Sequence, residues 1–291
     1  MGQDKVVAVM GSPGSGKTTA SIKMALELAS HKKNVIVVFC DPFTPVIPFV
    51  VPWTGEQASI GALLTAPSLT QKMILDSCIT IKDQEYISLI GYHLGDSLMA
   101  YPQITRERAV DFFVCLRHLS DYIIIDCAAV YEADVLSLVA MELSDRMIRI
   151  GTSNLRGISY FESRKIMLSD RRFGPEKQLH IIGNLKAGQE WEAVSEQYGG
   201  VAGILPYNAE LDQQYDELSL FEMLRDKEAA LYSNEIRKLI NLLFGMGKDN
   251  EETKMGVKDR NKTTASDQSK PGKERTRKKF TFHLNKNRGE F

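Results

Sequence analysis

Two patterns of apolar and polar positions alternate along the first 245 residues. Short apolar runs with the length of buried strands are separated by stretches in which apolar residues recur every three or four positions. The apolar runs predict strands at Lys5–Met10, Asn34–Cys40, Tyr86–Gly91, Tyr122–Asp126, Arg146–Ile150, His180–Leu185 and Val201–Leu205. The periodic stretches predict helices at Lys17–Ser30, Thr105–Leu119, Glu132–Leu143, Leu155–Leu168 and Gln189–Tyr198, and one or two closing helices within Glu217–Phe244. Strands that are apolar throughout are buried on both faces, so the pattern predicts an α/β fold: a doubly wound, mostly parallel sheet with helices on both faces.

Two segments depart from this alternation. Residues 42–67 contain five prolines, which do not allow a long regular element, so we expect a loop over the carboxyl edge of the sheet. Residues 248–291 are polar and charged, with thirteen Lys and Arg against seven Asp and Glu, a net charge of +6 within a chain of net charge -1. We therefore expect a nucleotide-binding domain over residues 1–247 and a basic, disordered tail over 248–291.

The composition is that of a globular protein in a reducing compartment. The chain has 291 residues, 43% of them hydrophobic, but no run of eighteen apolar residues, so we expect a cytoplasmic protein. A peripheral position beside a membrane machine is the alternative. The four cysteines have no CxxC spacing, which favours free thiols over a zinc site or disulfides. They are Cys40, Cys78, Cys115 and Cys127.

The strongest chemical signal is the stretch "GSPGSGKT" at residues 11–18. It fits the pattern GxxxxGK[ST], with a predicted strand before it and a predicted helix after it. Glycines let the backbone N–H groups point inward around a phosphate, and the start of the helix adds its positive end. Lys17 would bridge the β- and γ-phosphates, and the Thr18 hydroxyl would hold Mg²⁺. A glycine-rich turn before a helix is the alternative. The nucleotide-binding candidates are Gly11, Ser12, Pro13, Gly14, Ser15, Gly16, Lys17, Thr18 and Thr19.

Two carboxylates follow strands that end at the same predicted edge. Asp126 closes the apolar stretch "DYIIIDCAA", where it would hold Mg²⁺ through water, and a helix cap is the alternative role. Asp41 ends "VIVVFCDPF" and would orient the attacking water or contact the metal, although an Asp-Pro turn is a competing explanation. Lys17, Asp41 and Asp126 are thus the candidate catalytic residues, and Thr18, Asp41 and Asp126 the candidate magnesium ligands.

The order of these segments resembles the MinD/ParA group of phosphate-loop ATPases. The stretch "VVAVMGSPGSGKTTASIKMALELA" resembles the family's opening strand, loop and helix, and "NVIVVFCDPF" and "DYIIIDCAAV" resemble its next two motifs. "LSDRMIRIGTSNLRGI", "HIIGNL" and "GILPYNAEL" follow in the expected order. The resemblance covers most of residues 1–245. It implies a phosphate-loop NTPase fold, ATP and Mg²⁺ as cofactors, slow hydrolysis and an ATP-dependent homodimer.

The resemblance also implies an adenine site and three departures. Asn184, Pro206 and Tyr207 match the positions that contact adenine in the family, and a strand-end turn residue is the alternative for Asn184. The family's signature lysine, which reaches the partner's phosphates, is replaced by Ser12, and the first Asp of its Asp-x-Asp is replaced by Phe39. After Asp126 the family tends to have Pro or Gly, whereas this chain has "CAAV", so a γ-phosphate contact would come from the backbone N–H of Ala129 or Val130.

These observations lead to competing hypotheses. The first is a slowly hydrolysing switch ATPase that positions or partitions a cellular cargo through an unidentified protein partner. The second is a weakly hydrolytic or non-hydrolytic ATP-binding scaffold that localises a pilus or secretion machine, as in the Tad (Flp) branch of the family. A kinase or ligase on the same core is a third. The basic tail is a candidate for contact with nucleic acid or an anionic membrane, and a solvated tail is the competing explanation.

Overall fold

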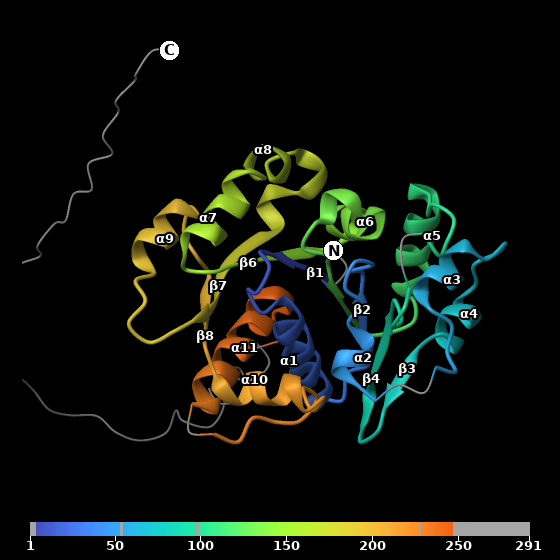
Figure 1. The fold of residues 1–291 in the computed structure, drawn as a ribbon, viewed down its shortest axis with the longest axis horizontal. Coiled ribbons are helices and arrows are strands. Elements are labelled where there is room, and N and C mark those ends of the chain that lie inside the picture. The colour runs from blue at the N-terminus through green and yellow to red at the C-terminus, as the bar shows by residue number, and fades with distance from the viewer. Residues whose placement is uncertain (1–3, 53–54, 97–98, 227, 247–291) are drawn as a thin grey trace, which may run out of the picture. The chain divides into compact units, whose positions relative to one another are not determined.

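A single sheet organises the molecule, and it confirms the predicted fold class. The computed structural model describes residues 4–52, 55–96, 99–226 and 228–246. Eight strands lie in the order β3-β4-β2-β5-β1-β6-β7-β8, and all neighbours are parallel except β3, which is antiparallel to β4 (Figure 1). The strands are β1 (Val6–Gly11), β2 (Val35–Phe39), β3 (Ile79–Ile81), β4 (Gln84–Gly91), β5 (Tyr122–Asp126), β6 (Arg146–Gly151), β7 (Gln178–Leu185) and β8 (Gly203–Pro206).

Helices cover both faces of the sheet (Figure 1). One face packs against α1 (Lys17–Ser30), α2 (Ile47–Val50), α10 (Ala209–Asp216) and α11 (Ala229–Phe244). The other packs against α3 (Ile60–Thr65), α4 (Gln71–Asp76), α5 (Arg106–Leu116), α6 (Val135–Leu143), α7 (Leu155–Glu162) and α8 (Lys165–Leu168). A helix α9 (Glu192–Gln197) and three short 3₁₀ turns, η1 (Tyr131–Ala133), η2 (Arg171–Phe173) and η3 (Pro175–Lys177), complete the described elements.

The central strand β1 shows why the apolar runs fold in this way. All six of its residues are buried, and successive side chains point to opposite faces. Val7 and Val9 therefore lie in the core beneath α1 and α11, whereas Ala8 and Met10 lie in the core beneath α5 and α6. A strand with two apolar faces has a place only in the middle of such a three-layer arrangement.

Two elements of the sheet's β3 side differ from the prediction. The strand β3 was not predicted, because it has three residues and continues into β4 through a two-residue turn, Lys82 and Asp83, that contains no glycine. Asp83 has a φ of 66°, a left-handed conformation that Asp tolerates better than most residues. The predicted loop at 42–67 contains the short helices α2 and α3: α2 has Pro48 in its first turn, where a missing N–H leaves no helical hydrogen bond unmade, and α3 lies between Pro52 and Pro67.

The helix predictions also need correction. Leu155–Leu168 is two helices, because the chain bends at Arg164, whose guanidinium lies 3.9 Å from the centre of the Tyr160 ring and pairs with Glu132 at 2.6 Å. The closing region contains one helix, α11, which starts twelve residues later than the predicted segment. Helix α10 was not predicted, and Asn208 caps its start by accepting the N–H of Leu211 at 3.2 Å.

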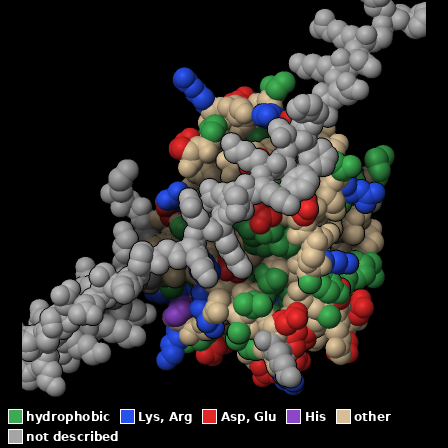
Figure 2. All heavy atoms as spheres, turned by 90° about the vertical axis from the view of Figure 1, so that its left-hand side faces the viewer, with side chains coloured by type: hydrophobic (Ala, Val, Ile, Leu, Met, Phe, Trp, Pro, Cys, Tyr) green, Lys and Arg blue, Asp and Glu red, His purple; other side chains and the backbone are tan. Residues whose placement is uncertain are grey.

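The surface shows interspersed charges over the part of one face that is visible. On the left-hand face of Figure 1, acidic and basic side chains mix over the described residues that the grey atoms leave uncovered (Figure 2). The predicted basic tail lies outside the described residues and stays a prediction. Among the described helices, none combines the length and apolar character needed to cross a membrane.

Candidate functional site

The phosphate-loop motif lies between the end of β1 and the start of α1. Gly16 lies at the N-cap of α1 in a left-handed conformation, with a φ of 86°. A residue with a side chain would adopt this conformation only with strain. It supplies no side-chain cap, and the first turn of α1 contains no acidic residue. The first N–H groups of the helix are therefore not satisfied by a side chain, and their partial positive charge faces the loop. This is the arrangement that binds phosphate at a helix start.

Neighbouring strands hold the loop closely. The N–H of Ser12 donates to the carbonyl of Ile150 on β6 at 3.1 Å, and the N–H of Ser15 donates to the carbonyl of Ser12 at 3.1 Å. Gly183 on β7 lies so close that a Cβ added there would be 2.2 Å from the carbonyl oxygen of Ser15. The loop is thus supported by β6 and β7, two strands that are distant from it in the sequence.

Thr18 and Asp126 meet at the mouth of this loop. The Thr18 hydroxyl donates to Oδ2 of Asp126 at 2.5 Å. Asp126 is only 4% exposed, and its Oδ1 is buried without a hydrogen-bond partner among the described residues. Burial raises the pKa of Asp126 to about 6, although nearby Lys17 and the Thr18 hydroxyl oppose that shift. The structure therefore brings three of the predicted residues together.

Two further buried oxygens in the phosphate loop have no hydrogen-bond partner among the described residues. They are the hydroxyls of Ser12 and Ser15, in addition to Asp126 Oδ1. Leaving a buried oxygen unpaired costs on the order of 1–3 kcal/mol, and a bound polar ligand or its waters would recover that cost. The arrangement is therefore suited to a polar ligand.

The donor set fits magnesium held with other ligands. Within the described residues, no group of three or more His, Cys, Asp or Glu side chains could hold a metal ion. Mg²⁺ usually takes one or two protein oxygens and completes its shell with water and phosphate oxygens. Thr18 and Asp126 supply oxygens of that kind, and Oδ1 of Asp126 has no hydrogen-bond partner within the described ranges.

Asp41 lies at the same edge but is partly engaged in a turn. Its Oδ1 accepts the N–H groups of Phe43 at 2.9 Å and Thr44 at 3.1 Å, as in the competing explanation of an Asp-Pro turn. Its charge nevertheless raises the pKa of Asp126, so the two carboxylates are near neighbours electrostatically. A role in orienting water stays a prediction, and Oδ1 is committed to the turn.

The loop after Asp126 has its first two amides occupied. The N–H of Cys127 donates to the carbonyl of Val9 at 2.9 Å, and the N–H of Ala128 donates to the Ser137 hydroxyl at 2.8 Å. Ala129 and Val130 come next, and the phosphate contact expected from their backbone N–H groups stays a prediction. The contribution of Ser137 was not predicted, since a serine within an apolar helix carries no distinct signal.

The predicted adenine residues lie together on β7 and β8. Leu185 pairs with Pro206, and the N–H of Tyr207 donates to the carbonyl of Leu185 at 2.8 Å. Asn184 has a φ of 57°, and its Nδ2 donates to the carbonyl of Gly14 in the phosphate loop at 3.3 Å. Asn184 therefore has the backbone conformation of a turn residue and also contacts the phosphate loop through its side chain.

A small cavity connects the phosphate loop to Asn184. Gly16 and Thr19 line it on the loop side, and Leu205, Leu211 and Asp212 line it on the other. Asp212 was not predicted as a site residue, because it belongs to the unpredicted helix α10. Its carboxylate accepts a hydrogen bond from the Tyr207 hydroxyl, which links α10 to one of the predicted adenine residues.

Comparison with solved structures identifies the fold. A ParA family ATPase from Chlorobium tepidum superposes with a TM-score of 0.67 at 16% identity, over 81% of this chain and 99% of that one. The septum site-determining protein MinD from Pyrococcus horikoshii, complexed with Mg-ADP, gives a TM-score of 0.63 at 14% identity, over 84% and 97%. A putative plasmid partition protein from Borrelia burgdorferi, bound to AMPPNP, gives 0.62 at 17% identity, over 82% and 99%.

These likenesses show that the chain has the fold of the ParA and MinD ATPases. At 14–17% identity they show the fold alone. No family model matches the sequence, and no curated protein matches it either.

Proposed function

We propose that the chain is a MinD/ParA-like ATPase that binds Mg·ATP as a molecular switch in positioning or partitioning a cellular cargo. The observation that carries this proposal is the pairing of Thr18 with Asp126 at the start of α1, where the second oxygen of Asp126 is buried and has no partner among the described residues. Solved proteins of the same fold bind Mg-ADP or AMPPNP, which supports the assignment of the nucleotide.

Each residue has a physical task in this proposal. Lys17 and the first N–H groups of α1 bind the phosphates, whose negative charge they offset. Thr18 and Asp126 hold the magnesium ion, directly or through water, and the ion neutralises charge on the phosphates. Protonation of Asp126 would oppose metal binding, and the pKa of this carboxyl, which burial raises to about 6, favours that protonation at mildly acidic pH.

The base would lie on the other side of the loop. Asn184, Pro206 and Tyr207 would contact adenine, and Thr19 lines the same small cavity as Asn184. The Lys186 ammonium is 5.0 Å from the centre of the Tyr207 ring, and this contact helps to fix the ring's position.

The direct test is nucleotide binding by the Lys17→Ala variant. Loss of a charged donor to phosphate should weaken Mg·ATP binding by about 10- to 100-fold, measured by isothermal titration calorimetry. Lys238→Ala, which removes an exposed ammonium on α11, is the matched control and should bind like the unaltered chain. A Lys17→Ala variant that keeps full affinity would sink the proposal.

A scaffold that binds ATP with little or no hydrolysis is the second candidate, and two observations favour it. Ser12 is fully buried and places no cation where the family has its lysine, and Asp41 commits one oxygen to a turn. Turnover by the purified chain separates the candidates. A steady rate that Asp41→Ala abolishes excludes the pure scaffold, and binding without turnover excludes the hydrolytic switch.

Self-association and partners belong to the same proposal. A switch of this kind would form an ATP-dependent homodimer and then bind a protein partner or cargo, with a pilus or secretion machine as the alternative for a scaffold. Gel filtration with and without ATP and Mg²⁺ tests the first step. A nucleotide-driven dimer would mean that another residue replaces the missing lysine at Ser12, and a constant elution volume would contradict dimerisation.

The location of the protein and its tail follow from the same proposal. We infer a cytoplasmic protein, peripheral to a membrane machine if it acts as a scaffold. The tail at 248–291 would then add contacts to nucleic acid or an anionic membrane through its excess of Lys and Arg.

A further inference from the structure

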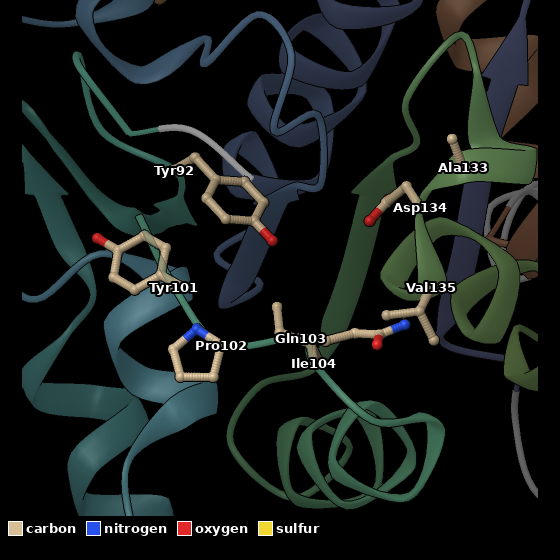
Figure 3. A pocket seen from close by; sticks show the side chains of 8 residues that line it. All are labelled: Tyr92, Tyr101, Pro102, Gln103, Ile104, Ala133, Asp134 and Val135. Atoms are coloured by element: carbon tan, nitrogen blue, oxygen red, sulfur yellow. The ribbon is translucent and has the colours of Figure 1, made fainter. Parts of the chain in front are cut away.

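A second cavity opens at the carboxyl edge of the sheet, and no phosphate-loop residue lines it. It has a volume of about 300 Å³ and lies between the loop that follows β4 and the loop that leads from β5 into α6 (Figure 3). Tyr92 and Tyr101 form aromatic walls, and Ile104 and Val135 add apolar surface. This volume suits a small ligand or a single side chain.

Three polar side chains meet in this cavity. In Figure 3 the hydroxyl of Tyr92 and the carboxylate of Asp134 point toward each other across the space, and the amide of Gln103 extends toward Val135. Tyr92 is 3% exposed and Asp134 is 4% exposed, so both are withdrawn from bulk water. Because a buried polar group is costly unless it is hydrogen-bonded, these two groups favour a ligand that can form hydrogen bonds with them.

The Tyr101 wall is held in place by its neighbours. Asp96 accepts hydrogen bonds from the Tyr101 hydroxyl at 2.7 Å, from the His93 N–H at 2.8 Å and from the Ser59 hydroxyl. The Tyr101 ring also packs on α3 at Gly61, where an added Cβ would lie 2.3 Å from a ring carbon. This wall is therefore formed before any ligand binds.

The opposite wall is fixed by the start of α6. Asp134 caps that helix by accepting the N–H of Ser137 at 2.8 Å and that of Leu136 at 3.3 Å. These bonds compensate its charge only in part, because burial and the nearby charge of Asp41 raise the pKa of Asp134 to about 6. None of the ion pairs in the described part of the chain includes Asp134, and no Lys or Arg lines the cavity.

We propose that the cavity between Tyr92 and Asp134 binds an organic cation, a primary ammonium or a guanidinium group. The carboxylate of Asp134 would form a charge-assisted hydrogen bond with it, and the Tyr92 oxygen and the Gln103 carbonyl oxygen would accept its other N–H groups. The rings of Tyr92 and Tyr101 add the faces that attract cations. This site is separate from the nucleotide site, and the inference does not depend on the proposed ATPase function.

The cation could be a free small amine or a Lys or Arg side chain of a peptide, and the probes distinguish these sources. The full chain, without nucleotide, is titrated by NMR with butylguanidine, with its neutral analogue butylurea, and with the peptide KPGKERTRKK, which repeats residues 270–279 of this chain. Saturable binding of butylguanidine, with butylurea at least about tenfold weaker, supports the site. Tighter binding of the peptide identifies a side chain as the source, and tighter binding of butylguanidine identifies a small molecule.

Variants locate the binding. Asp134→Asn removes the charge but keeps an oxygen that can cap α6, and it should weaken butylguanidine binding about tenfold or more. Tyr92→Phe should cause a smaller loss, and Glu107→Gln, which removes an exposed carboxylate on α5, should cause none. Thermal unfolding checks that each variant is folded. Equal binding by Asp134→Asn and the unaltered chain, or equal binding of butylguanidine and butylurea, overturns the proposal.

Discussion

Asp126 and Asp134 are both buried carboxylates at the carboxyl edge of the sheet, and their surroundings differ. Asp126 lies beside the phosphate loop and accepts one hydroxyl, and its Oδ1 has no partner in the part of the chain that the structure describes. Asp134 accepts two backbone N–H groups as a helix cap and faces a cavity with aromatic walls. Burial raises both pKa values to about 6. Equal burial and equal acidity therefore do not imply equal function, because the remaining partners decide what each carboxylate can bind.

The largest expected effect is on the free energy of unfolding, because ionising either of these buried carboxylates destabilises the folded chain. Each folded pKa lies above the ordinary 3.8, so the unfolded chain binds fewer protons than the folded one between pH 4 and 6. Ionisation of these two groups should therefore lower the free energy of unfolding by about 3 kcal/mol each as pH rises through this window, whereas His180, whose pKa burial lowers to about 3, should raise it over the same range. Urea unfolding without nucleotide, at pH 4 to 7, measures it.

Single variants should divide this pH dependence between the two regions. Asp126→Asn and Asp134→Asn should each remove about 3 kcal/mol of the decline caused by these carboxylates, since each eliminates one of the two similar ionisations, and the opposing contribution of His180 should stay in both variants. A pH dependence that neither substitution changes would show that other groups cause it, and the electrostatic likeness of the two regions would be wrong.

The second effect should separate the two regions. Gly183→Ala places a Cβ 2.2 Å from the carbonyl of Ser15, so the phosphate loop or β7 must move, at a cost of about 1–3 kcal/mol in unfolding free energy. Mg·ATP affinity should fall, whereas butylguanidine binding beside Asp134 should not change. Gly203→Ala on β8 is the control, because its added Cβ would meet nothing closer than 3.7 Å. Equal effects of the two substitutions would contradict the close support of the loop by β7.

The smallest effect concerns one hydroxyl. Thr18→Ala removes the donor to Asp126 and the oxygen proposed for Mg²⁺, so it should weaken Mg·ATP binding about tenfold. Thr18→Ser keeps the hydroxyl and should restore most of that affinity. Titration of both variants at a fixed Mg²⁺ concentration measures the difference, and identical losses in both would mean that the methyl group, not the hydroxyl, is what matters.

The fold around the phosphate-loop motif could be predicted from the sequence, because the residues of the motif are contiguous. Residues 11–18 include the end of β1, a turn and the start of α1 in a fixed spacing. The strand that ends in Asp126 is apolar, so the sequence pattern assigns it to the buried sheet. The roles assigned to these residues remain predictions. The position of Gly183 beneath Ser15 depends on a crossover that local patterns do not contain.

The Tyr92–Asp134 cavity was not predicted, for a related reason. Its residues come from two loops, and nothing in the spacing of Tyr92, Gln103 and Asp134 shows that their side chains converge. The unpredicted strand β3 and the bend at Arg164 have a similar origin. One depends on a turn without glycine, and the other on the contacts of one side chain with Tyr160 and Glu132.

The most direct test of the central claim is the magnesium dependence of ATP binding. Isothermal titration of the full chain with ATP, with and without Mg²⁺, would be compared for the unaltered protein, Asp126→Asn and Asp134→Asn at pH 7.5. Magnesium should strengthen ATP binding by the unaltered chain and by Asp134→Asn, but not by Asp126→Asn. Absence of ATP binding by the unaltered chain, or an undiminished magnesium effect in Asp126→Asn, would contradict the account.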